Sequence, residues 1–433
     1  MNVAVLLVLL FLGWFLNLMA ARTPAGYGDQ AVLVLGFVLL GAAAVGRLVR
    51  RGRLPMITGY LLAGLAFGPH LAGRLSPQLT LFTPEVLQQL RLIDDLALGL
   101  IAFTAGGELK MATLRPRLRA ILAVSGVQVP VVTLGVGLVA FALGPHLSFL
   151  AGKPPTFWLA AAMVLGITAL APSPATTIAV INESEARGPF ATVAMGTTVT
   201  NDVLSLLLFS GSLMFVNKLL QPETAVDLAM LGLVVWEVLG SLIAGLLLGL
   251  ALRGYIRHIG RELPLLILTL AFVSMQAAAA LHLSGILVCL AAGFYVENFT
   301  DHGEAMIAAV DRYSLPVYIV FFTLAGAKIN LPVLRQMWAA TLILVLARGA
   351  FLFAGARLGS RLGRSEPTVR REIWKVLVGQ AGISLGLAMI VGRSVPEIGP
   401  ALQTLLVALI AVNQLIGPIL LRQALARSGE AKP

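Results

Sequence analysis

Apolar residues occur along the chain in long runs, and short polar segments separate the runs. A helix that crosses a bilayer needs about 20 mostly apolar residues. Charged residues, proline and glycine mark where the runs end. The pattern predicts an all-α polytopic membrane protein with fourteen spans, at residues 2–20, 31–50, 55–73, 92–112, 118–143, 156–182, 188–215, 225–253, 263–281, 283–299, 311–329, 338–360, 373–393 and 401–423.

Two alternatives stay open in this count. The run 2–20 has the length of the apolar part of a signal peptide and ends near the small residues Ala20 and Ala21, which would leave thirteen helices. No basic segment precedes this run, and its absence favours a retained helix. Residues 263–299 could also be divided differently.

Composition and charge agree with a membrane protein. The chain is 58% hydrophobic and 12% charged, with a mean hydropathy of +0.92. A net charge of +11 would suggest nucleic acid in a soluble protein. Here the basic residues lie in short segments between apolar runs, where they suit anionic lipid headgroups. We predict the lipid bilayer as a partner, and no nucleic acid.

The placement of lysine and arginine predicts the orientation. If both termini are cytoplasmic, 22 of the 31 basic residues lie in cytoplasmic segments and 8 in outer ones, with Arg348 inside a span. If one early span were miscounted, every later loop would move to the other side of the membrane, and this bias would be unlikely. We therefore predict a multi-pass protein of a bacterial-type inner or plasma membrane, with both termini in the cytoplasm.

The sequence lacks the residues that several classes of protein function require. Cys289 is the only cysteine, so the chain has no internal disulfide and no cysteine metal site. The five histidines show no ligand spacing, and no glycine-rich phosphate loop lies between a strand and a helix. An intramembrane aspartyl protease would need a second aspartate in mid-span, whereas Asp94 and Asp95 lie at a span start. We predict neither a cofactor nor enzymatic activity.

Three ionisable residues fall well inside spans: Asp202, Glu237 and Arg348. Such a residue costs about 2.5–3.5 kcal/mol at the bilayer centre, and it usually has a partner or faces a wet cavity. Glu237 and Arg348 could simply pair and hold two helices together. Asp202 follows Asn201 in the apolar stretch TTVTNDVLSLLLF, which makes it the first functional candidate.

The span before Asp202 carries Pro172 and Pro174 near its middle, and two such prolines should break the helix. Non-helical backbone at membrane depth occurs where it lines a cavity or is buried in protein, and broken helices form the cation sites of many transporters. Ser173, Thr176 and Thr177 would add hydroxyl groups there. The alternative is a proline kink whose hydroxyls bond back to the helix.

Internal symmetry predicts a second break. Shifting the sequence along itself until Asn201 and Asp202 fall on Asn413 and Gln414 also moves Pro174 onto Gly386. A glycine-rich span then takes the place of the broken one, so two broken helices could cross near the midplane of inverted repeats. Small residues that pack helices explain the glycines nearly as well. The residues of this second interruption are Gly379, Gln380, Gly382 and Ser384.

Six segments resemble the monovalent cation:proton antiporter superfamily, in the same order and over nearly the whole chain. They are LPMITGYLLAGLAFGPHLAG (54–73), LIAFTAGGELKM (100–111), APSPATTIAV, TVTNDVLSLLLF, Arg348 with GARLGSRL, and GQAGISLGLAM. The third is similar to that family's unwound helix and the fourth to its ion-binding helix.

The resemblance implies roles for the candidate residues. Asp202 would be the carboxylate that exchanges a monovalent cation for a proton. As our hypothesis of mechanism, Asn201 would orient this carboxylate or donate an amide oxygen, without taking a proton itself. Neutral oxygens would come from Ser173, Thr176 and Thr177. Arg348 would stabilise the core, either by pairing with Glu237 or by facing the carbonyl ends of the broken helices.

The same resemblance implies the stoichiometry and the ion. An Asn-Asp pair with a late arginine goes with electroneutral exchange in that family. The sequence Ser-Pro-Ala-Thr-Thr looks closer to the Asp-Asp or potassium-handling branches, so sodium, potassium and lithium all stay open.

The family's fold implies a homodimer, with a scaffold for dimerisation and a six-helix core that moves by alternating access. We assign residues 1–91 and 225–299 to the scaffold, 92–215 and 311–423 to the core, and 424–433 to a cytoplasmic tail. Two other functions stay open: a sensor or regulatory subunit that binds ions without flux, and a transporter of another solute with Arg348 as an anion contact.

Overall fold

The computed structural model describes residues 30–52, 54–71, 82–221, 228–260, 262–301, 303–329, 331–381, 383–395 and 397–431. All regular secondary structure in these residues is helical. The predicted first span, 2–20, and Gly382 lie outside the described residues.

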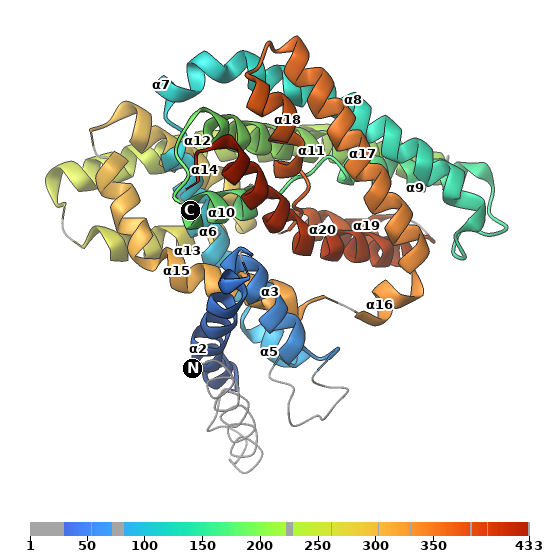
Figure 1. Cartoon of the computed structure of the whole chain (residues 1–433), viewed down its shortest axis with the longest axis horizontal. Helices are drawn as coiled ribbons and strands as arrows, with labels where there is room; N and C mark the ends of the chain where they lie inside the picture. Colours follow the sequence, from blue (N-terminus) through green and yellow to red (C-terminus); the bar gives the residue numbers. More distant parts are fainter. Residues whose placement is uncertain are drawn as a thin grey trace.

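The elements are α2 (Gln30–Arg51), α3 (Met56–Phe67), α5 (Pro84–Gln89), α6 (Arg91–Glu108), α7 (Met111–Leu114), η2 (Arg115–Arg117), α8 (Leu118–Leu143), η3 (Gly144–His146), α9 (Pro155–Thr168), α10 (Pro174–Glu183), α11 (Pro189–Leu220), α12 (Leu228–His258), α13 (Leu263–Ala280), α14 (Gly285–Phe299), α15 (Gly303–Ala327), α16 (Leu331–Gln336), α17 (Trp338–Leu362), α18 (Pro367–Val376), α19 (Ile383–Ser394) and α20 (Gly399–Ser428). Figure 1 shows their arrangement.

Most predicted spans coincide with helices, and two boundaries differ for clear reasons. Helix α3 ends at Phe67 and not near residue 73, because Gly68 precedes a proline and has extended backbone. Helix α15 begins at Gly303, well before the predicted start at Asp311. The charged pair Asp311-Arg312 predicts a boundary, but the helix runs through it. Residues 263–299 form two helices, α13 and α14, as predicted.

The long helices have the length and the surface of membrane spans. Within the described residues, six helical stretches are long and apolar enough to cross a membrane, and five shorter helices are equally apolar. Helices α8 and α17 expose large apolar side chains such as Leu134 (72%), Leu138 (69%) and Leu346 (64%). These side chains are suited to lipid, and the chain is an integral multi-pass membrane protein.

Two spans are broken, as predicted. The first consists of α9 and α10, which residues 169–173 separate, and the second of α18 and α19. The predicted shift places the start of α9 at Pro155 on the start of α18 at Pro367, but it fits the later helices less well. That shift would start α19 at Gly386 and α20 at Ala401, whereas the helices start at Ile383 and Gly399.

The helices pack in two groups (Figure 1). Helix α8 packs along α17 and α9, whereas α14 packs along α6 and α12, and α15 along α3. Gly106 of α6 lies so close to α14 that an added Cβ would come within 2.0 Å of the Leu290 carbonyl oxygen. The division into core and scaffold stays a prediction; this packing favours moving α6 and α15 from the predicted core to the scaffold.

Candidate functional site

The two breaks lie against each other and complete each other's hydrogen bonds. The backbone N–H of Ser173 in the first break donates to the carbonyl oxygen of Gly379 in the second, at 2.9 Å. In return, Nε2 of Gln380 donates to the carbonyl oxygen of Thr168, the last residue of α9, also at 2.9 Å. Backbone groups buried away from water need such partners. The unwound segments therefore stabilise one another.

Arg348 of α17 joins the same two breaks from the other side. Its guanidinium is buried and donates from Nε to Ala169 O (2.7 Å), from Nη1 to Val378 O (2.7 Å) and from Nη2 to Leu377 O (2.9 Å). The last carbonyls of a helix have no partner within the helix and carry partial negative charge. One arginine thus neutralises the carboxyl ends of both α9 and α18.

This geometry corrects one of the two roles predicted for Arg348. The arginine faces the carbonyl ends of the broken helices and does not pair with Glu237. Within the described residues neither side chain makes an ion pair, and Glu237 lies half-buried on α12.

The three predicted hydroxyl residues gather at the start of α10. Ser173 caps the helix, accepting from the Thr176 backbone N–H at 3.1 Å, and the Thr176 hydroxyl donates to Ser173 Oγ at 3.0 Å. The Thr177 hydroxyl donates to Ser173 O at 3.1 Å and lies 3.5 Å from the hydroxyl of Thr198. The alternative in which hydroxyl groups bond back to their own helix therefore holds in part, for Thr176 and Thr177. Thr177 in addition reaches α11.

Asn201 and Asp202 lie on α11, one helical turn after Thr197 and Thr198. The pair is buried, with 0% and 3% of the surface exposed. Within the described residues, both polar side-chain atoms of Asn201, Oδ1 of Asp202 and the Thr197 hydroxyl have no hydrogen-bond partner. Buried polar atoms without partners are rare and costly, and they point to a role beyond packing.

Helix α20 supplies a further amide to the breaks. Asn413 Nδ2 donates to Gln380 Oε1 at 2.8 Å. Gly417, one turn later, lies so close to the second break that an added Cβ would be 2.4 Å from the Cα of Gly379. The predicted interruption residues Gly379 and Gln380 are thus held by α20, and Ser384 lies just beyond them, its Oγ 3.5 Å from Ala171 O.

Sequence reasoning missed two contributors. Thr197 and Thr198 could have been found from the four-residue spacing to Asn201 and Asp202, which puts them on the same helix faces. Asn413 was found by symmetry, but its contact with Gln380 has no signal in the sequence.

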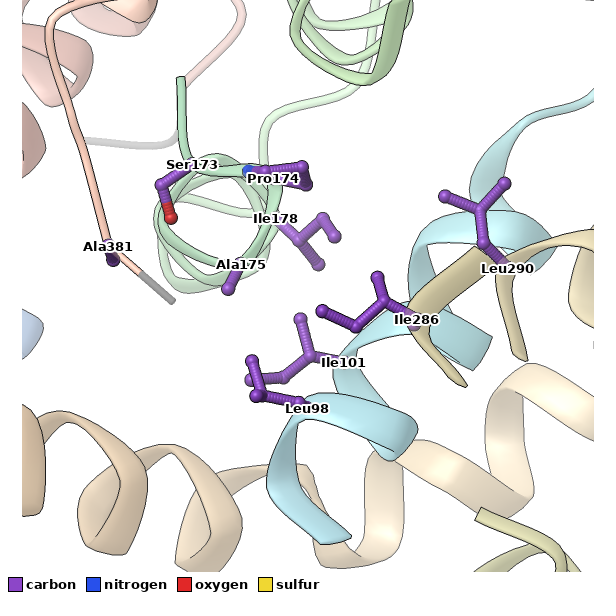
Figure 2. A pocket seen from close by; sticks show the side chains of 10 residues that line it. Leu98, Ile101, Ser173, Pro174, Ala175, Ile178, Ile286, Leu290 and Ala381 are labelled. Atoms are coloured by element: carbon purple, nitrogen blue, oxygen red, sulfur yellow. The ribbon is translucent and has the colours of Figure 1, made fainter. Parts of the chain in front are cut away.

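A mostly apolar cavity reaches the first break (Figure 2). Leu98 and Ile101 of α6 and Ile286 and Leu290 of α14 form one wall, and the other wall includes Ser173 and the first turn of α10. The cavity lies beside the contacts that α6 makes with α10. An open space therefore borders the first break on the side of α6 and α14.

The polar side chains around Asp202 are oxygen donors of the kind that bind hard cations. In the described residues no three His, Cys, Asp or Glu side chains gather as they would around a multivalent metal. Asp202 offers one carboxylate, with an amide and hydroxyl oxygens on neighbouring turns. Hard cations prefer such oxygen ligands.

Known proteins resemble this chain in sequence and in fold. The family described as "Sodium/hydrogen exchanger, transmembrane" matches residues 35–427. A structure of the sodium proton antiporter MjNhaP1 from Methanocaldococcus jannaschii at pH 8 superposes with a TM-score of 0.65 and 18% identity, over 92% of this chain and 96% of that one. An electron-microscopy map of the same antiporter gives 0.67 and 18%, over 93% and 99%. No curated protein sequence matches the chain.

Proposed function

Because the chain belongs to the sodium/hydrogen exchanger family, we propose that it is a secondary active antiporter that exchanges a monovalent cation for protons by alternating access. The observation that carries the proposal is Asp202, a buried carboxylate with an unpartnered oxygen on the helix that contacts the first break.

Asp202 would alternate between two loaded states. A bare carboxylate is costly to move through a low-dielectric interior, whereas a carboxyl that holds a proton or a cation carries no net charge. A core that moves only when Asp202 is loaded exchanges one ion for the other. Asn201 would orient the carboxylate or offer its amide oxygen, and Thr177 and Thr198 would border the path to it.

We further propose that the exchange is electroneutral, with one proton for one cation. Asn201 does not titrate, so Asp202 is the single titratable carboxyl of the pair. The charge of Arg348 is engaged by the carbonyl ends of α9 and α18 and stays in place during the cycle. Sodium is our first choice of cation, as in the structural neighbour; potassium and lithium are the others.

The proposal includes the quaternary arrangement. A scaffold that contains α12–α14 would form a homodimer, and the core with the two breaks would move against it. The apolar cavity between α6, α14 and the first break lies along that boundary. Both termini would be cytoplasmic.

The test is transport by the full chain in proteoliposomes. Asp202→Asn should reduce cation-driven proton flux to background, because the amide can neither release a proton nor neutralise a cation. The matched control is Glu237→Gln, which also removes a mid-span carboxyl but should keep the flux. Both variants should elute at the same volume as the wild type in size-exclusion chromatography. Normal flux in Asp202→Asn would show that the site lies elsewhere.

The same vesicles separate the other possibilities. Fluorescence dequenching with sodium, potassium and lithium identifies the cation, and an imposed voltage should leave an electroneutral rate unchanged. If cations raise the melting temperature of the wild type but it transports none, the chain is instead a sensor or regulatory subunit that binds ions without flux.

A further inference from the structure

A second cavity lies away from the breaks, where three loops meet. It is formed by the starts of α8 and α11 and by the loop between α17 and α18, and it has a volume of about 290 Å³. This volume is close to the lower end of the range for small-molecule sites, about 300–1,000 Å³. The distribution of basic residues predicts all three segments on the cytoplasmic side.

The walls of this cavity are basic. Arg117, Arg119 and Arg364 line it, against one carboxylate, Glu366. Arg117 is held in place because Nη1 donates to Thr113 O at 2.8 Å. Within the described residues Arg119, Arg364 and Glu366 make no ion pair. The excess of positive charge is therefore not neutralised by the protein.

Glycines at the end of α17 allow it to pack closely on α8. An added Cβ at Gly359 would lie 2.7 Å from Ala123 O, and one at Gly363 would lie 3.0 Å from the Cβ of Ala123. The end of α17 thus packs directly on the start of α8. Arg119 of α8 and the exposed Arg364 just beyond α17 therefore line the same cavity, and both would attract an anion that entered it.

Two neutral groups in the cavity also suit an anion. Ser365 is 6% exposed, and its hydroxyl has no hydrogen-bond partner among the residues that the structure describes. Helix α18 has no side-chain cap, and its first turn lines the cavity through Val369. Uncapped first-turn N–H groups and the helix dipole favour negative charge. The start of α11 offers no such group, because Glu430 already accepts from Phe190 N and Ala191 N.

We propose that this cavity binds a phosphate-bearing anion, supplied by a phospholipid headgroup or by soluble phosphate. Arginine forks bind phosphate oxygens in pairs, and a serine hydroxyl donates to a third. Basic pockets between membrane helices on the cytoplasmic side recognise headgroups by the same chemistry. The site is independent of the ion exchange proposed above.

The test uses the purified full chain in neutral detergent, with inorganic phosphate or short-chain phosphatidylglycerol as the probe at constant ionic strength. We expect at least one probe to raise the melting temperature with a saturable dose response. Saturation by phosphate identifies a soluble anion as sufficient, and saturation by the lipid alone identifies the headgroup.

The variants decide whether the cavity is responsible. In Arg119→Gln/Arg364→Gln the Kd should rise at least tenfold, and Ser365→Ala should weaken binding less. Arg257→Gln on α12 removes a similar exposed charge elsewhere and should keep the wild-type Kd. Without a probe, the double variant should melt no lower than the wild type, because within the described residues neither arginine has an ion pair to lose. The proposal is overturned if neither probe stabilises the wild type, or if the double variant binds as well as Arg257→Gln.

Discussion

Both broken helices interrupt a membrane span, but different kinds of residue keep each of them broken. The first break has two prolines, Pro172 and Pro174, and a serine cap, so its own sequence prevents a continuous helix. The described residues of the second break, 377–381, contain no proline. That break is held open by Arg348, Gln380 and the close approach of α20. A local signal specifies the first break, whereas tertiary contacts specify the second.

Removing Arg348 should have the largest effect on both breaks. Arg348→Ala leaves the carbonyls of Ala169, Leu377 and Val378 buried without partners, each at a cost of about 1–3 kcal/mol. We expect a large fall in the melting temperature of the purified chain. Arg335→Ala, at an exposed arginine on α16, is the control. An unchanged melting temperature in Arg348→Ala would contradict the structural role.

A smaller effect should come from the contact that holds the second break alone. In Gly417→Ala the new methyl would meet the backbone of Gly379 at 2.4 Å, and such overpacking costs about 1–3 kcal/mol. Gly379→Ala is the matched control, since its methyl would meet Thr176 Cγ2 at an ordinary 3.5 Å. The melting temperature should fall in the first variant and change little in the second. Equal effects would mean that the close approach is not what constrains this break.

The smallest effect should come from the cap of the first break. Ser173→Ala removes an N-cap, which costs about 1 kcal/mol, but the prolines remain and should keep the helix broken. Ser284→Ala removes the equivalent cap of α14, which accepts from Leu287 N. Both variants should lose similar thermal stability, while only Ser173→Ala should also slow transport. Slow transport in both would place the effect in general stability.

The same contrast explains how far the sequence predicts the fold. Run lengths and basic residues located most spans, because lipid and charge act on each segment separately. The first break was predicted from its prolines. The second rested on the symmetry that places Asn201 on Asn413. That symmetry sets the starts of α19 and α20 slightly too late, since α18 has 10 residues where α9 has 14.

In the candidate site, the sequence predicts which residues are unusual but not which distant residues they contact. Asp202, Asn201 and the hydroxyls of α10 stood out as polar groups in apolar spans. The partners of Arg348 did not, because backbone carbonyls 179 and 30 residues away carry no residue-type signal. The choice between Glu237 and those carbonyls needed the structure. The basic cavity likewise depends on α8 meeting the end of α17.

The bonds between the breaks also have a consequence for biosynthesis. Gln380, which satisfies the end of α9, is 212 residues later in the chain than Thr168. Ribosomes add about 5–20 residues per second, so roughly 10–40 s pass between the synthesis of the two partners. During that interval the first half sits in the bilayer with its carbonyls unsatisfied. Until the second half is synthesised, water or the membrane-insertion machinery must therefore supply hydrogen bonds to these carbonyls.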